Sequence, residues 1–266
     1  MFLNPNSDYP RNFLIIALFM SITLFTAFHE GYLPLISISF WLFLLAGFGL
    51  CFWLAISIST KHLLALIFAI VIIEYIKETI GIISGLWIYH GVHGFYNFGI
   101  WCWVLGGLST YTLATRIIIT RLGNLNLPVS RRGNARIIVA LFVLIPIMLL
   151  GYWRGAGGGF WSFYLLLLIF CVILVPRLDF SVLTGLVVTS WLVGASGEYL
   201  GGISSHVWSF PLNPHYPPGY LVICCWPLEI LAQYGLAAIL ANQPLNPTPW
   251  EEKGPYATND QRRAVL

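Results

Sequence analysis

The chain has 266 residues, of which 58% are hydrophobic and only 9% are charged, and its formal net charge at pH 7 is +3. Soluble domains carry roughly 25% charged residues, so this composition argues against a soluble globular protein. The small net charge also gives no footprint of a nucleic-acid-binding protein. Long apolar runs recur along the whole chain and predict an all-α integral membrane protein.

Eight apolar segments are long enough to cross a bilayer, which takes about 20 residues of helix. In chain order they cover residues 12–29, 34–58, 62–89, 98–121, 135–153, 159–176, 179–203 and 218–241. The loop at 123–136 is the only long polar connector between them and divides them into two sets of four. We therefore expect a first four-helix unit at 1–122, a linker at 123–136, a second four-helix unit at 137–242 and a polar tail at 243–266.

Lys and Arg residues gather on one side of this topology. With eight spans, both termini and the even-to-odd loops share a side that holds all of the 13 Lys and Arg residues except Lys77 and Arg154. Lys77 lies inside a span, and Arg154 lies in a loop on the opposite side. The positive-inside rule then predicts a multi-pass protein of the cell (inner) membrane with both termini in the cytoplasm.

The two halves of the chain repeat each other at a nearly constant offset. "ETIGIISG" (78–85) matches "EYLGGISS" (198–205), and "CWVLGGLSTYTLA" (102–114) matches "CWPLEILAQYGLA" (225–237). Ordered matches that include Trp, Cys, Tyr and Glu are hard to obtain by chance between apolar helices. An even number of spans in each unit predicts two parallel four-helix repeats, related by an axis along the membrane normal.

Glutamates stand inside the matched spans. Glu78 and Glu198 occupy equivalent positions of the repeat, whereas Glu74 and Lys77 have glycine counterparts. An ionisable residue at bilayer depth costs on the order of 3 kcal/mol, so several of them together favour a functional role. A carboxyl group in an apolar cavity can keep its proton and donate it to an uncharged substrate. The structural alternative is ion pairing, in which Lys77 neutralises a neighbouring carboxylate.

Glu229, in "WPLEILAQY", is a further candidate acid, and its counterpart in the first half is Gly106. We expect Pro227 to kink the helix just before it, because proline removes a backbone donor. The candidate catalytic residues are therefore Glu74, Glu78, Glu198 and Glu229.

Aromatic residues follow the glutamate motif in both halves, as W-x-[YF]. They form either an interfacial belt or the walls of a pocket that stabilises a carbocation by cation–π contact. We assign the following residues to substrate binding: Lys77, Trp87, Tyr89, Trp208, Phe210, Tyr111 and Tyr234. His90 and His93 are three residues apart, but the repeat holds no matching pair, so we predict neither a metal site nor a cofactor.

The run Glu78-x-x-Gly81-x-x-Ser84-Gly85, with an aromatic pair after it, resembles the membrane carotenoid hydratases. The wider pattern, which ends in Pro227-Leu228-Glu229, is similar to the lycopene cyclases built from two small membrane domains. Those cyclases usually carry Asp at the first acidic position and a doubled Glu after Pro-Leu, whereas Ile230 follows Glu229 here. The resemblance implies acid-initiated cyclisation or hydration of a polyene, without a redox cofactor, on a lipid-soluble isoprenoid that arrives from the membrane lipid.

Two other classes of protein fit the same pattern. Parallel repeats and buried carboxylates are also found in proton-coupled transporters of small molecules. A non-catalytic subunit of a membrane complex would also present small-residue helix faces. A water-accessible cavity lined by Glu74, Lys77 and Glu78 would indicate a transporter, and a closed apolar cavity open to lipid would indicate an enzyme.

Overall fold

The computed structural model describes residues 7–119, 158–211 and 225–246, and most of these lie in helices. Three helical stretches are long and apolar enough to cross a membrane, namely Tyr9–His29, Ile38–Ala55 and Phe180–Ser204; Ser162–Arg177 and Trp226–Ala241 are shorter apolar helices. The described part of the chain is therefore compatible with an all-α membrane protein. The predicted span at 135–153, the linker at 123–136 and most of the tail at 243–266 lie outside the described residues.

The helices follow one another in a simple order. They are α1 (Tyr9–His29), α2 (Ile38–Ala55), α3 (Thr60–Ile83), α4 (Asn97–Leu113), α7 (Gly158–Leu174), α8 (Phe180–Gly197) and α10 (Trp226–Ala241). Two of them continue as π-helices, α4 as η2 (Ala114–Ile118) and α8 as η4 (Glu198–Ser204), and two 3-10 turns are η1 (Val92–Gly94) and η3 (Val175–Arg177). Strands β1 (Ile88–Tyr89) and β2 (Trp208–Ser209) pair antiparallel, with Ile88 opposite Ser209 and Tyr89 opposite Trp208.

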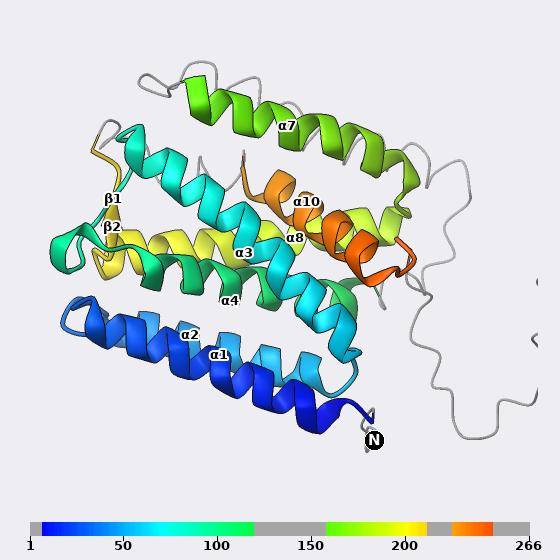
Figure 1. Ribbon diagram of the computed structural model, residues 1–266, viewed down its shortest axis with the longest axis horizontal. Coiled ribbons are helices and arrows are strands. Elements are labelled where there is room, and N and C mark those ends of the chain that lie inside the picture. The colour runs from blue at the N-terminus through cyan, green and yellow to red at the C-terminus, as the bar shows by residue number, and fades with distance from the viewer. Residues whose placement is uncertain (1–6, 120–157, 212–224, 247–266) are drawn as a thin grey trace, which may run out of the picture.

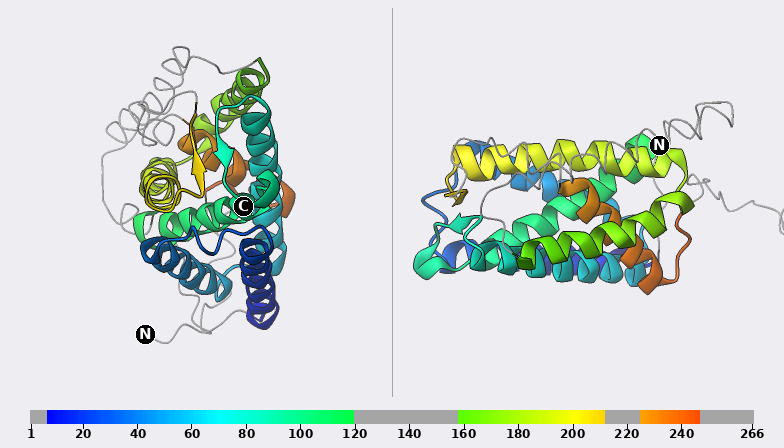
Figure 2. Two further views of the ribbon diagram at one scale, coloured as in Figure 1. Left: turned by 90° about the vertical axis from the view of Figure 1, so that its left-hand side faces the viewer. Right: turned by 90° about the horizontal axis from the view of Figure 1, so that it is seen from above.

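Helices α3, α4, α8 and α10 form the centre of the molecule (Figure 1). Helix α3 packs against α10 and α4, and α8 packs against the same two helices. Helices α1 and α2 cover one side of this centre, mainly through α4, while α7 covers the opposite side against α10 and α3 (Figures 1 and 2). Interior side chains are therefore held by helices from both halves of the chain.

The two ends of the bundle differ in chemistry. One end, which we call the basic end, carries Arg11 near the start of α1, Lys61 near the start of α3, Arg116 in η2 and Arg177 just before α8. There Asn12 closes the end of α2, because its Nδ2 donates to the carbonyl oxygens of Ala55 (3.1 Å) and Ile58 (2.6 Å). The opposite end, the strand end, carries β1 and β2 (Figure 1).

A buried carboxylate fixes the start of α4 at the strand end. Glu30 accepts hydrogen bonds from Asn97 Nδ2 (2.6 Å) and from the backbone N–H of Phe98 (3.0 Å). The first amides of a helix have no partner inside the helix, and its dipole favours a negative charge there. Glu30 therefore anchors the loop after α1 to α4, whose Trp103 reaches the centre of the bundle.

The predicted helix at 62–89 is wrong at its end, because α3 stops at Ile83. Gly85 adopts a φ of +67°, and the backbone N–H of Leu86 donates to the carbonyl of Gly81 at 2.9 Å. This is a left-handed helix cap, which glycine adopts without steric strain. The chain then reverses, so Trp87 returns over the end of α3 and Tyr89 lies in a strand.

Pro227 also occupies a different place from the one expected. Helix α10 begins at Trp226, so Pro227 lies in its first turn rather than at a kink within the described helix. A proline is accommodated there because the first backbone N–H groups of a helix have no intrahelical partner.

Candidate functional site

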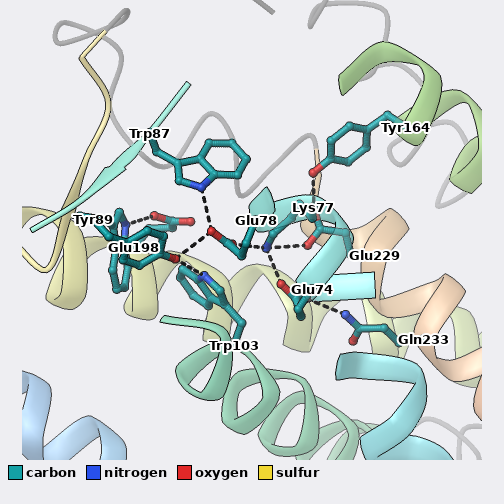
Figure 3. Close-up of polar contacts among 11 residues, drawn as sticks. Glu74, Lys77, Glu78, Trp87, Tyr89, Trp103, Tyr164, Glu198, Glu229 and Gln233 are labelled. Atoms are coloured by element: carbon teal, nitrogen blue, oxygen red, sulfur yellow. Dashed lines mark hydrogen bonds and ion pairs between the residues drawn. The ribbon is translucent and has the colours of Figure 1, made fainter. Parts of the chain in front are cut away.

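Four glutamates and one lysine meet in the centre of the bundle (Figure 3). Helix α3 supplies Glu74, Lys77 and Glu78, the first residue of η4 is Glu198, and the first turn of α10 supplies Glu229. None of the five is more than 6% exposed. The polar groups that the sequence separates by up to 155 positions, from 74 to 229, therefore form one buried cluster.

Lys77 contacts three of the four glutamates, and we call it the hub of this cluster. Its Nζ lies 2.5 Å from Glu74 Oε2, 3.2 Å from Glu78 Oε1 and 3.3 Å from Glu229 Oε2. The same nitrogen lies 5.1 Å from the centre of the Trp103 ring, within range of a cation–π contact. Buried ion pairs stabilise a fold only where the remaining polar atoms are also hydrogen-bonded, so the outer partners of the carboxylates matter.

Two of the carboxylates are held from outside by neighbouring helices. The Tyr164 hydroxyl of α7 donates to Glu229 Oε1, and Gln233 Nε2 of α10 donates to Glu74 Oε1 at 2.7 Å. Each of these glutamates thus bridges Lys77 and a neutral donor, which fixes the orientation of its carboxylate.

Glu78 has the richest set of donors. Its Oε2 accepts from Trp87 Nε1 at 2.7 Å and from the Tyr89 hydroxyl at 2.9 Å, while its Oε1 faces Lys77. Trp103 Nε1 in turn donates to the Tyr89 hydroxyl at 3.1 Å, which orients that hydroxyl toward Glu78. One cation and two neutral donors suit a carboxylate anion.

Glu198 has a much poorer set of partners. Its Oε2 accepts from Trp208 Nε1 at 2.9 Å, and within the described residues it forms no ion pair with Lys or Arg. It is nonetheless only 6% exposed. Of the four glutamates in the cluster, Glu198 is therefore the one whose surroundings compensate a negative charge least.

The tryptophans reach the glutamates because glycine leaves space for their rings. A Cβ on Gly81 would lie within the indole of Trp87, and a Cβ on Gly201 would lie within the indole of Trp208. The two glycines thus let each indole lie directly on the helix that carries its glutamate.

A cavity of about 30 Å³ lies between these side chains, which is room for a single water molecule. Seven of its lining residues are aromatic: Trp87, Tyr89, Trp103, Tyr164, Trp208, Phe210 and Trp226. Lys77, Glu78, Glu198, Glu229 and Cys225 complete the lining. The cavity is therefore an aromatic chamber with ionisable groups in its wall.

Most of the predicted site residues meet at this cavity. The structure places Glu78, Glu198, Glu229 and Lys77 in its wall, together with the four aromatic residues of the two W-x-[YF] elements. Glu74 does not line the cavity and contacts Lys77 instead. Tyr111 and Tyr234 lie elsewhere, with ring centres 6.0 Å apart, and the Tyr234 hydroxyl donates to the Leu245 carbonyl. The structure does not bring these two tyrosines into the cavity.

Sequence reasoning missed several residues of the site. Trp103 and Trp226 stand at equivalent positions of the CW motif, with ring centres 5.2 Å apart, so the alignment of the halves carried a signal for them. Tyr164 and Gln233 carried no such signal, because their roles depend on which helices pack against α3 and α10.

No protein-family model matches this chain, and no match was found among curated proteins or solved structures.

Proposed function

We propose that this protein is a membrane enzyme that protonates a double bond of a long isoprenoid, such as a carotenoid precursor, and that the resulting carbocation closes a ring or captures water. The observation that carries the proposal is the cavity itself, in which carboxyl groups face a chamber walled by aromatic rings. An acid in an apolar site can protonate an alkene, and aromatic faces stabilise the cation that follows.

Glu198 is the acid in this proposal. A bare carboxylate at bilayer depth is costly, and among the described residues Glu198 has a single indole donor to offset that cost. The neutral acid suits these surroundings better than the anion does. Its carboxyl group lies in the cavity wall, where it can face a bound double bond.

Glu78 is the base. The reaction begins when the O–H of Glu198 gives its proton to one alkene carbon, which forms a C–H bond and leaves a cation on the adjacent carbon. The electron pair of a second double bond then closes a C–C bond, and a proton lost from carbon to the Glu78 carboxylate restores a double bond. The net reaction is an isomerisation. In the hydration variant, water adds to the first cation and gives its proton to the carboxylate.

Lys77 is a positioning residue in this scheme. Its ammonium group contacts Glu74, Glu78 and Glu229, and it lies on the face of Trp103. It supports the ionised state of Glu78 and fixes that carboxylate beside the cavity. The asymmetry of the cluster, with Lys77 beside one equivalent glutamate and not the other, supports a division into base and acid.

The size of the cavity limits what it can take. Binding sites for small molecules hold about 300–1,000 Å³, whereas this cavity measures about 30 Å³, so the end group of a substrate enters only if the aromatic side chains of the wall move apart. The remainder of such a substrate would stay among the lipid chains. The proposal therefore concerns the end group of a linear isoprenoid.

We further propose that the chain forms eight spans in two parallel four-helix units, with the basic end in the cytoplasm. Residues aligned in the repeat contact each other where the two halves meet: Ile88 pairs with Ser209, Trp103 packs on Trp226, and Tyr111 packs on Tyr234. Self-paired contacts of this kind are expected along a two-fold axis. The basic residues at one end support the orientation.

Proton-coupled transport is the second candidate function. Its support is Lys77, which is shared by three carboxylates in the centre of the bundle and could change partners as they bind protons. The aromatic lining of the cavity favours the enzyme.

The test is the pigment content of cells that make an acyclic carotenoid, such as lycopene, and express the full chain. We expect a new cyclic or hydrated product from the wild type and a loss of about 100-fold or more in Glu198→Gln, since general acids contribute about 10²–10⁴-fold. Tyr199→Phe, at the exposed neighbouring position, is the matched control. Unchanged product in both Glu198→Gln and Glu78→Gln would rule out the mechanism, and proton-dependent uptake without any product would favour transport.

A further inference from the structure

Glu74 is not explained by the chemistry of the cavity. Its carboxylate lies behind Lys77, outside the cavity lining, and joins Lys77 (2.5 Å) to Gln233 (2.7 Å). Helix α10 runs toward the basic end, so Gln233 lies one turn nearer that end than Glu229 (Figure 1). Glu74 and Gln233 thus extend the polar cluster away from the cavity, toward the basic end.

Two buried polar atoms lie on this extension. Gln233 Oε1 and Thr110 Oγ1 have no hydrogen-bond partner within the described part of the chain, although their residues are only 2% and 0% exposed. Buried polar groups in proteins are nearly always satisfied, and ordered water supplies the partner where the protein does not. These atoms therefore mark a place where water would be bound.

The geometry puts the two atoms beside the same stretch of α4. A Cβ on Gly107 would lie 3.1 Å from Gln233 Oε1, so the amide oxygen rests on the helix at a position that only glycine leaves open. Thr110 follows Gly107 by three residues and shares that face of α4. Since α4 also runs toward the basic end, Thr110 lies beyond Gln233 on the way to that end.

We propose that water held between Gln233 and Thr110 forms a proton route from the basic end to Glu74 and through Lys77 to the carboxyl groups of the cavity. This inference rests on the proposed function, because an acid that protonates a substrate must exchange protons in order to turn over. A protonated water at Gln233 gives its proton to the Glu74 carboxylate. Lys77 then gives a proton to Glu78 and regains one from Glu74, and Glu78 passes a proton to Glu198 across the cavity that both line, so that Glu198 is again the neutral acid and Glu78 the carboxylate.

The test follows proton exchange without any substrate. In the full chain reconstituted in lipid vesicles, the infrared C=O band of protonated carboxyl groups shifts when the proton is replaced by a deuteron. After transfer to D₂O, we expect this shift to be at least about tenfold slower in Gln233→Leu and in Thr110→Val than in the wild type. Thr112→Val is the matched control, because the Thr112 hydroxyl donates to the Leu108 carbonyl of its own helix at 2.7 Å.

Equal exchange rates in the wild type, Gln233→Leu and Thr110→Val would overturn the route. Thr110→Val is nearly isosteric and keeps the result interpretable if the leucine variant does not fold. A wild-type spectrum without a protonated carboxyl band would also overturn it, because the route ends on a group that takes up a proton. Failure of the proposed function is a separate result, since unchanged product from Glu198→Gln contradicts the acid assignment at any exchange rate.

Discussion

Glu78 and Glu198 stand in two surroundings that share a framework and differ in charge. In each, a tryptophan shortly after the glutamate donates its indole N–H to the carboxylate, at 2.7 Å from Trp87 and 2.9 Å from Trp208. In each, a glycine three residues after the glutamate lets that indole lie on the helix. The framework therefore holds a carboxyl group beside an aromatic cavity twice.

The two surroundings differ within the helical turn that precedes each glutamate. The first half has Glu74 and Lys77, and the second half has Gly194 and Gly197. A Cβ on Gly194 would lie 2.6 Å from the Trp226 ring, and one on Gly197 would lie 3.0 Å from the Trp103 ring. Where the first half places an ion pair, the second half accepts aromatic rings from α4 and α10.

This comparison teaches how one scaffold can serve two protonation states. A carboxylate beside an ammonium group is supported as an anion, and a carboxyl group beside aromatic rings is better tolerated when neutral. The repeat supplies the position of the glutamates, and the departures from the repeat supply the division of roles between them.

Removing the charge at the hub should have the largest effect on stability. Lys77→Met leaves Glu74, Glu78 and Glu229 without their shared cation, and loss of one partner of a buried ion pair costs about 3–5 kcal/mol. The measurement is thermal unfolding of the purified protein in detergent. Lys61→Met, at the exposed basic end, is the control and should change stability by about 0.5 kcal/mol or less. A similar small change in Lys77→Met would show that the hub does not hold the cluster together.

Crowding the two indoles tests whether the shared framework is equivalent in both halves. Gly81→Ala and Gly201→Ala each place a methyl group in the volume of a tryptophan ring, and overpacking costs about 1–3 kcal/mol. We expect similar losses from both substitutions in the same unfolding measurement. Gly49→Ala, where a Cβ meets no atom within 4 Å, is the control. A loss in only one of the two variants would break the equivalence.

Replacing the indole donors should have a smaller effect than the changes above, and this effect should differ between Glu198 and Glu78. Trp208→Phe removes the hydrogen bond to Glu198, whereas after Trp87→Phe the Glu78 carboxylate keeps Tyr89 and Lys77. Glu198 loses its one hydrogen-bond donor among the described residues, whereas Glu78 keeps two partners, so product formation should fall further in Trp208→Phe. The pigment assay measures this, and a larger fall in Trp87→Phe would reverse the assignment of acid and base.

The tyrosines outside the cavity should have the smallest effect. Tyr111→Phe keeps the ring that packs on Tyr234 and removes only a hydroxyl group far along α4 from the cavity lining. We expect unchanged product composition and a change in rate of less than about twofold. A strong loss of product would indicate that Tyr111 belongs to the substrate-binding site.

The sequence could predict the site better than it could predict the ends of the helices. Buried charge in an apolar chain singles out Glu74, Lys77, Glu78, Glu198 and Glu229, because each is expensive wherever it lies in a membrane. Helix ends depend on single backbone torsions, such as the +67° φ of Gly85, and periodicity does not encode these. Contacts such as Tyr164 to Glu229 depend on how α7 packs, which local pattern does not specify.

The central claim is that Glu198 is neutral and Glu78 ionised in the resting protein, and infrared spectra of the full chain in lipid vesicles test it most directly. Glu198→Gln and Glu78→Gln are compared with the wild type in the C=O region of protonated carboxyl groups. The account predicts that a band disappears in Glu198→Gln and persists in Glu78→Gln. A band that persists in Glu198→Gln and disappears in Glu78→Gln would contradict it.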